Sequence, residues 1–209
     1  MLNTPEKSLS TIIKERKSVR IYDSNYIISK EEIEEILKEA TLAPSSSNLQ
    51  SWKFLVISDP TIKKELRAIA NNQEQVETSS AIIAVLGDVD AYKNVERIYK
   101  SGYEKGYIDE ASMERVIKST YNTYPNAPLE VRKNIASFDA GLVSMQLMLI
   151  AKSKGYDTVT MGGFDKEKFV EKFNIEDRYI PIVLIAIGKA AGPAFNTTRL
   201  PLDEVVRFI

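Results

Sequence analysis

The chain has 209 residues, of which 44% are hydrophobic and 27% are charged, and its net charge is -1 at pH 7. This composition is typical of a globular unit with its own core, and a charge near zero excludes a global field that recruits nucleic acid or anionic membrane. The chain contains no cysteine and no histidine. Thiolate and imidazole catalysis, disulfides and cysteine-ligated clusters are therefore excluded, which favours a bound redox cofactor for any chemistry.

Hydropathy indicates a protein without a membrane span. The longest apolar run, Leu142 to Ala151, contains Ser144 and Gln146 and is far shorter than the ~20 residues that a bilayer requires. The first residues lack the apolar stretch of a signal peptide. We therefore expect a cytoplasmic protein, and because we find no repeat or linker we expect a single domain over residues 1–209.

Helical and strand patterns alternate through the first half of the chain. Apolar residues at helical spacing follow Ser8, a capping box joins Ser29 to Glu32, and Asp59 precedes a proline at a first helical position. A continuous apolar run over 81–86 predicts a strand buried on both faces. The expected elements are helices over 8–16, from Ser29 to before Pro44 and from Asp59 to Ile69, and strands over 52–57 and 81–86.

The second half predicts a long central helix between shorter elements. Two short helices are expected over 88–126, followed by a helix over 128–154 that Gly155 ends. This helix is apolar nearly all round from Leu142 to Ala151, which favours burial against a partner subunit. Strands over 158–161 and 181–187 flank a helix capped by Asp165, and the alternating residues 205–209 suit a strand at a sheet edge, in this or a neighbouring subunit. The pattern predicts an α+β fold, an α/β sandwich.

Cations gather where the first helix ends. Arg16, Lys17 and Arg20 surround Ser18 within five positions, and guanidinium groups with a neighbouring hydroxyl suit a phosphate. Solvated cations at a helix C-terminus are the alternative interpretation. No GxGxxG, P-loop or metal-ligand spacing occurs, so we expect no Rossmann nucleotide site and no metal.

Three further stretches carry polar or flexible residues that can contact a ligand. The loop from Pro44 to Gln50 is rich in hydroxyl and amide groups, Gly162-Gly163 allows a flat ring to approach the backbone, and Arg199 follows Thr197 near the end of the chain. Each stretch taken alone is also typical of an ordinary loop, turn or surface.

Taken together and in this order, these stretches resemble the FMN-dependent nitroreductase family. The resemblance is carried by Glu15 to Tyr22, Ala43 to Trp52, Met161 to Asp165 and Thr198 to Pro201. It implies a mixed sheet flanked by helices and a homodimer with a domain-swapped tail. It also implies two FMN sites at the subunit interface, each built from both chains.

The resemblance assigns the FMN-binding residues. One subunit is expected to bind the phosphate and the pyrimidine edge of the flavin, and the other subunit is expected to contribute its polar loop. Near the phosphate these are Arg16, Lys17, Ser18 and Arg199; at the ring they are Arg20, Asn72, Gln73, Gly162 and Gly163; from the other subunit they are Pro44, Ser45, Ser46, Asn48 and Gln50. Thr197 stands where many members carry a lysine, and Gly162 where some carry an acidic residue.

The implied function is an FMN-dependent NAD(P)H oxidoreductase that reduces nitroaromatics, quinones or similar acceptors by ping-pong hydride transfer through flavin N5. Negative charge that develops on the reduced flavin suits a fixed guanidinium such as Arg20. We expect no covalent intermediate with the protein and no catalytic acid or base at the ring. A flavin-processing relative of the same fold, a non-catalytic flavin-binding module and a cofactor-free dimeric interaction protein remain alternatives.

Overall fold

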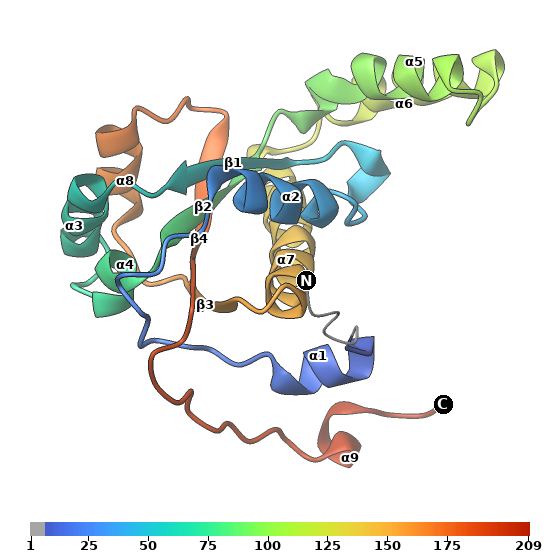
Figure 1. Cartoon of the computed structure of the whole chain (residues 1–209). Helices are drawn as coiled ribbons and strands as arrows, with labels where there is room; N and C mark the ends of the chain where they lie inside the picture. Colours follow the sequence, from blue (N-terminus) through green and yellow to red (C-terminus); the bar gives the residue numbers. More distant parts are fainter. Residues whose placement is uncertain (1–6) are drawn as a thin grey trace.

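The structure, a computed structural model, describes residues 7–209 and is built around one sheet with helices on both faces (Figure 1). The sheet has four strands in the order β1-β2-β4-β3, and neighbouring strands run antiparallel. One isolated parallel bridge joins Ser18 to Thr158 at the β3 edge. The expected α+β fold is confirmed. The expected mixed sheet has its parallel pairing only at this bridge within residues 7–209, because the four strands are antiparallel to their neighbours. The strands are β1 (Trp52–Ile57), β2 (Ala81–Asp88), β3 (Asp157–Met161) and β4 (Tyr179–Gly188).

Helices connect and cover the strands. The α-helices are α1 (Leu9–Glu15), α2 (Lys30–Ala40), α3 (Pro60–Ile69), α4 (Glu74–Thr78), α5 (Val95–Glu104), α6 (Glu110–Thr123), α7 (Leu129–Ser153), α8 (Lys166–Phe173) and α9 (Leu202–Val205). Two short 3₁₀ turns are η1 (Ser46–Asn48) and η2 (Ala91–Asn94). Of the α-helices, only α4 and α9 were absent from the sequence-based expectation, because neither exceeds five residues and a turn this short shows no hydrophobic period.

Side chains cap the predicted helix starts. Ser29 and Glu32 form the complete capping box of α2, and Asp59 accepts the backbone N–H of Ile62 at 2.9 Å at the start of α3. Asp165 accepts the backbone N–H of Lys168 at 3.0 Å. These bonds satisfy N–H groups that have no partner inside their helix, so local sequence alone determines where the helices begin.

The core consists of two layers, one on each face of the sheet. On one face Leu66 of α3 and Phe169 of α8 pack against β2 and β4; on the other, Ile36 of α2 and Leu147 of α7 do so. Strand β2 is buried along its whole length, as predicted. The sheet can therefore present a ligand only at its edges or ends.

The central helix α7 buries only one side within its own chain. Ala140, Val143 and Leu147 are fully buried, whereas 64% of Phe138 and 41% of Met145 are exposed. By length and composition α7 could cross a membrane, but its buried side packs on the sheet, as the core helix of a globular protein does. The predicted all-round burial of this apolar helix is therefore not achieved by one chain.

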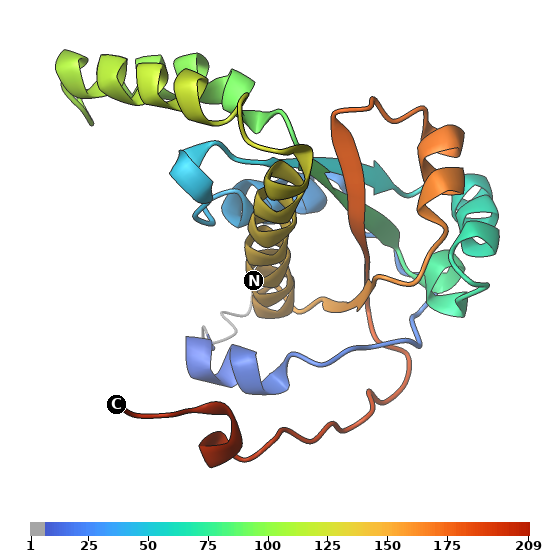
Figure 2. The same ribbon diagram turned by 180° about the vertical axis from the view of Figure 1, so that it is seen from behind.

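The chain after β4 leaves the sheet and continues below α1 (Figures 1 and 2). Within residues 7–209, no residue after Gly188 belongs to a strand of this sheet, so the tail adds no strand to its own sheet. Leu202–Val205 instead forms one helical turn after Pro201, and within residues 7–209 the tail does not pair with the outer edge of β1. Phe208 is 91% exposed.

Helices α5 and α6 form an arm that projects from the body (Figure 1). Ion pairs secure its base: Arg178 binds both carboxylate oxygens of Asp88, and Arg132 of α7 contacts Asp90 at 2.5 Å. Bidentate and half-buried ion pairs of this kind fix the positions of their side chains better than exposed pairs with one hydrogen bond. The arm is thus fixed where it joins β2.

We predict that Glu32→Gln lowers the melting temperature at pH 7 by about 2–4 °C, the shift that ~1 kcal/mol produces in a chain of this size. Hydrogen bonds from Tyr156 and from Ser29 hold the pKa of Glu32 below its ordinary value of 4.5. Because the folded pKa is the lower one, this stabilisation is present above pH 4.5 and is lost as the pH falls through the folded pKa.

Thermal unfolding of both proteins from pH 7 to pH 3 measures the effect, and the two curves should converge at acid pH. Glu31→Gln is the matched control, since Glu31 is exposed in the same helical turn and forms no hydrogen bond between side chains in residues 7–209. A constant difference at every pH would contradict the role of the carboxylate charge.

Candidate functional site

The cation cluster lies on an extended segment beside the β3 edge. Arg16 ends α1, and the N–H of Val19 donates to the carbonyl of Thr158 at 3.1 Å. Val19 is buried. Because side chains alternate along an extended chain, Arg16, Ser18 and Arg20 share the face opposite Val19. Three of the predicted FMN-binding residues are thus presented together at one edge of the sheet.

These cations have no carboxylate partners within the described chain. In residues 7–209, no ion pair includes Arg16, Lys17, Arg20 or Arg199. Elsewhere in residues 7–209, Arg67, Arg132 and Arg178 pair with acids, whereas the isolated Arg97, Arg115 and Arg207 do not. A group of guanidinium side chains left without counter-charges fits an anion such as a phosphate.

The tail passes next to this cluster. Lys17 Nζ donates to Asn196 Oδ1 at 2.5 Å, and the N–H of Ala191 donates to the carbonyl of Ile21 at 2.9 Å. Arg199 itself donates to Thr197 Oγ1 at 2.8 Å and to the carbonyl of Thr198 at 2.7 Å. The structure thus brings the segment that carries Arg199 to the cluster, while its guanidinium group binds its own segment.

The glycine turn after β3 is open to a ligand. A Cβ on Gly162 would meet no atom within 4 Å, and a Cβ on Gly163 would meet Asn71 Nδ2 at 3.3 Å. The carbonyl of Gly162 accepts the N–H of Phe164, but within residues 7–209 the N–H groups of Gly162 and Gly163 donate no hydrogen bond outside the sheet ladder. The backbone of the turn can therefore be approached closely by a flat ring and can donate to it.

Amide side chains from the turn before α4 hold the glycine turn. Asn71 Nδ2 and Gln73 Nε2 donate to the carbonyl of Gly163 at 2.9 and 3.1 Å. Asn72, a predicted site residue, has its side-chain oxygen bound instead by Arg67 at 3.0 Å. The sequence pattern predicted Asn72 and Gln73 but not Asn71, whose only signal was its place in the same polar turn.

The loop Pro44–Gln50 is held in an unusual conformation. Ser47, Asn48 and Gln50 all have positive φ angles, between 51° and 54°. Ser45 Oγ accepts the N–H of Gln50 at 2.9 Å, and the carbonyl of Ser47 accepts the hydroxyl of Tyr99 at 3.1 Å. Left-handed backbone is uncommon outside glycine, and clusters of it occur where the surroundings fix a functional loop.

Side chains from the arm and from α7 provide these surroundings. The hydroxyls of Ser47 and Tyr124 lie 2.9 Å apart, and Asp139 of α7 accepts two hydrogen bonds from Ser46. Burial raises the pKa of Tyr99, so its hydroxyl stays a donor. These anchors were not predicted from the sequence; the one signal was a lone carboxylate, Asp139, just before the apolar part of a helix.

One chain does not bring this loop to the cation cluster. Figures 1 and 2 both show η1 beside α2 and the arm, far from the β3 edge where Ser18 meets Thr158. Pro44, Ser45, Ser46, Asn48 and Gln50 are therefore separated from the other predicted site residues within a single chain.

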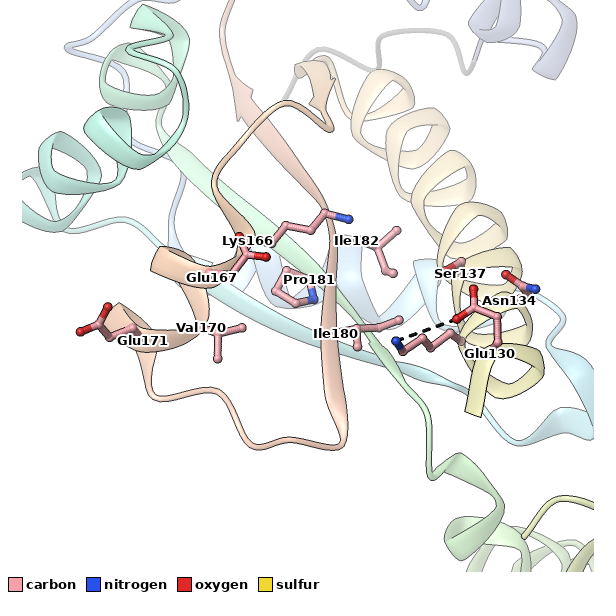
Figure 3. Close-up of a pocket in the computed structure, with 11 residues that line it drawn as sticks. Glu130, Asn134, Ser137, Lys166, Glu167, Val170, Glu171, Ile180, Pro181 and Ile182 are labelled. Carbon is pink, nitrogen blue, oxygen red and sulfur yellow. Dashed lines mark ion pairs between the residues drawn. The ribbon is translucent and has the colours of Figure 1, made fainter. Parts of the chain in front are cut away.

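A cavity of about 650 Å³ opens between α7, α8 and β4. Figure 3 shows Lys166 of α8 and Ile182 of β4 at this cavity, opposite the α7 residues Asn134 and Ser137. The β3–β4 ladder ends where Met161 pairs with Leu184. The residues that line the cavity include neither glycine of the turn nor any other predicted site residue. In residues 7–209, no group of acidic side chains could hold a metal ion.

Comparison with known proteins agrees with this geometry. Residues 13–189 match the model of the Nitroreductase family. The chain is 45% identical to a Bacillus subtilis protein named "Putative NAD(P)H nitroreductase YdgI", covering 94% of this chain and 95% of that protein. It is 34% identical to the CLA biosynthesis enone reductase of Lactiplantibacillus plantarum, covering 99% and 97%.

Solved structures share the whole fold. A crystal structure from Exiguobacterium sibiricum, titled as a "putative nitroreductase in complex with FMN", is 45% identical and superposes with a TM-score of 0.93 over 97% of this chain and 98% of that one. The family match spans most of the chain, and these relatives exceed 30% identity over nearly their full length. The chain therefore belongs to the nitroreductase family.

Proposed function

We propose that this protein is an FMN-dependent NAD(P)H oxidoreductase. The observation that carries the proposal is the set of uncompensated cations at the β3 edge, Arg16, Lys17 and Arg20 with Ser18, beside a glycine turn whose N–H groups are open to a ligand. The FMN bound by the Exiguobacterium relative supports the choice of ligand. We also propose that residues 1–209 form a single domain and that the protein acts in the cytoplasm.

Each end of the cofactor has a chemically suitable partner in this arrangement. Arg16, Ser18 and Arg199, with Lys17 close by, would bind the phosphate; for Arg199 this requires its guanidinium to leave the Thr197 and Thr198 oxygens. Gly162 and Gly163 would lie along the ring, with Gln73 holding the turn in place. Asn72 is proposed to contact the ring through the side-chain amide group that Arg67 leaves free.

When bound, FMN supplies an atom that accepts and donates hydride, which explains why a chain without histidine or cysteine can catalyse a redox reaction. The role of the protein is electrostatic and positional. Arg20 would place a fixed positive charge at the pyrimidine edge, where negative charge develops on reduction, and the glycine N–H groups would orient the ring. No side chain of this site is proposed as an acid or base.

We propose that two chains complete each site. Within one chain Pro44, Ser45, Ser46, Asn48 and Gln50 lie far from the cation cluster, so they are proposed to reach the flavin of a partner subunit. Large apolar side chains are exposed where a partner would pack, on α1 (Leu9 and Ile13), on α7 (Phe138 and Met145) and along the tail (Phe195, Leu200, Phe208). Unpartnered apolar surface of this extent is typical of a subunit interface.

The acceptors are proposed to be nitroaromatics, quinones and other electron-poor conjugated compounds. The enone reductase relative, at 34% identity over nearly the whole chain, favours adding conjugated enones to this group. All of these accept hydride from a reduced flavin at an electron-poor conjugated centre.

We predict that Arg16→Ala and Arg199→Ala each weaken FMN binding about 10- to 100-fold, because each removes a charged hydrogen bond worth ~1.5–3 kcal/mol. Quenching of flavin fluorescence on titration into apoprotein measures the dissociation constant. Lys64→Ala is the control, since Lys64 is an exposed cation of α3. Equal affinity in all these variants would contradict the phosphate assignment.

We predict that NADH or NADPH added under argon bleaches the visible flavin absorption of the purified protein, and that a quinone then restores it. A flavin that binds but is not reduced would favour the non-catalytic flavin-binding module. A protein that stays colourless after incubation with FMN would favour the cofactor-free interaction protein.

We predict that Phe138→Glu converts a dimer to a monomer and removes most of the bound flavin, because the charge would have to be buried at the interface. Analytical ultracentrifugation gives the mass, and flavin released on denaturation gives the occupancy. Ser58→Glu, which adds the same charge at an exposed position between β1 and α3, should change neither. A Phe138→Glu protein that stays dimeric and yellow would exclude this face of α7 as the interface.

A further inference from the structure

The loop Pro44–Gln50 depends on one carboxylate that the sequence motifs did not include. Asp139 lies on α7 and is 0% exposed. Its Oδ1 accepts the backbone N–H of Ser46 at 2.9 Å and the hydroxyl of Ser46 at 2.9 Å. Both bonds reach the loop from a helix of the core, 93 positions further along the chain.

Within residues 7–209, every hydrogen bond of this carboxylate is made to the loop. Its second oxygen, Oδ2, is buried and has no hydrogen-bond partner within residues 7–209. Burying a carboxylate with incomplete hydrogen bonding is unfavourable. Packing alone does not explain a carboxylate at this position of α7, because an aliphatic side chain would fill the same space without this cost. Within residues 7–209, the hydrogen bonds of Asp139 are made to Ser46.

The position of Ser46 determines the conformation of the residues around it. Ser47 and Asn48, which follow it directly, have left-handed φ angles of 51° and 52°, as does Gln50 with 54°. Such backbone is unfavourable for these residues and persists only where neighbouring contacts hold it. A bond to Ser46 from a rigid core helix acts just before the segment that needs this support.

The same bonds limit what Ser46 can offer to a ligand. Its hydroxyl hydrogen is donated to Asp139, so the oxygen can only accept a hydrogen bond from a further group. A phosphate or a ring carbonyl cannot supply that bond, because both are acceptors. The groups of FMN that can donate are the ribityl hydroxyls and the pyrimidine N–H, and the pyrimidine N–H is proposed to lie near Arg20. The ribityl hydroxyls are therefore the donors that remain for the Ser46 oxygen.

We infer that Asp139 is a positioning residue for the flavin site. It holds the loop Pro44–Gln50 in its left-handed form and orients the Ser46 oxygen to accept a hydrogen bond from a ribityl hydroxyl of the FMN bound mainly by the partner subunit. This inference rests on the proposed function, and it assigns a role to a residue that does not itself touch the cofactor.

Three substitutions test it through FMN affinity of the apoprotein. Asp139→Ala should weaken binding at least 100-fold, whereas Asp139→Asn, which keeps an acceptor oxygen for Ser46, should stay within about tenfold of the unmodified protein. Ser46→Ala should weaken the binding of FMN about tenfold and leave the binding of lumiflavin, which lacks the ribityl chain, unchanged. Ser144→Ala is the control, since Ser144 is also buried on α7 with an unpartnered hydroxyl.

A mixed dimer separates positioning from general damage to the fold. Arg16→Ala and Asp139→Ala chains are co-expressed with different tags, and the heterodimer is purified through both. Each variant alone has two weakened sites and binds little flavin at a concentration near the dissociation constant of the unmodified protein, but the heterodimer has one site with an intact Arg16 from one chain and an intact loop from the other. It should therefore bind about half of the normal flavin.

Three results would overturn the inference: Asp139→Ala binding FMN like the unmodified protein, Asp139→Asn failing as completely as Asp139→Ala, or a heterodimer without flavin. If Asp139→Ala does not fold, the comparison of Asp139→Asn with Ser46→Ala for FMN and lumiflavin decides. Failure of the proposed function is distinguishable, because the unmodified protein would then bind no FMN.

Discussion

Burial of β2 on both faces is the constraint on which the rest of the structure depends. All residues from Ala81 to Asp88 are buried, with α3, α4 and α8 packed over one face and α2 and α7 over the other. A sheet covered in this way offers ligands only its edges and ends. The β3 edge, where Ser18 meets Thr158, is the edge beside which cations without counter-charges are placed.

The distribution of charge follows from the same arrangement. At the end of β2 that leads into the arm, Asp88 and Asp90 neutralise Arg178 and Arg132, so the cations there stabilise the base of the arm. Beside the β3 edge, Arg16 and Arg20 have no such partners in residues 7–209. Cations neutralised by carboxylates hold structure, whereas cations left free attract an anion. The gathering of three such cations within five positions, more than the number of basic residues, identifies the candidate site.

The geometry of a single chain also explains why the site is proposed to be shared. The loop Pro44–Gln50 is fixed to α7 through Asp139 and to the arm through Tyr99 and Tyr124. It cannot reach the cation cluster of its own chain without losing these bonds. The exposed apolar side of α7, which includes Phe138, gives a second chain a reason to pack there. Cofactor binding and dimer formation are therefore expected to be coupled.

Much of the fold could be predicted because its signals are local. Ser29, Asp59 and Asp165 cap helices through bonds to backbone groups three positions away, and continuous apolar runs predicted β2 and β4. The cation cluster and the glycine turn were recognisable as motifs for the same reason. The tail was predicted less fully: residues 205–209 alternate like a strand but add no strand to their own sheet, and a turn of helix forms before them. A strand added to a neighbouring subunit stays a prediction.

The sequence by itself determined the helix boundaries, the buried strands and the residue types able to bind an anion, since each depends on neighbours within a few positions. Only the tertiary structure decided which of these residues meet. It placed Asn71 on the carbonyl of Gly163, Asp139 on Ser46, and the loop Pro44–Gln50 away from the cation cluster of its own chain. Such contacts join segments distant in the chain, and they arise from the packing of helices on the sheet, which no local pattern encodes.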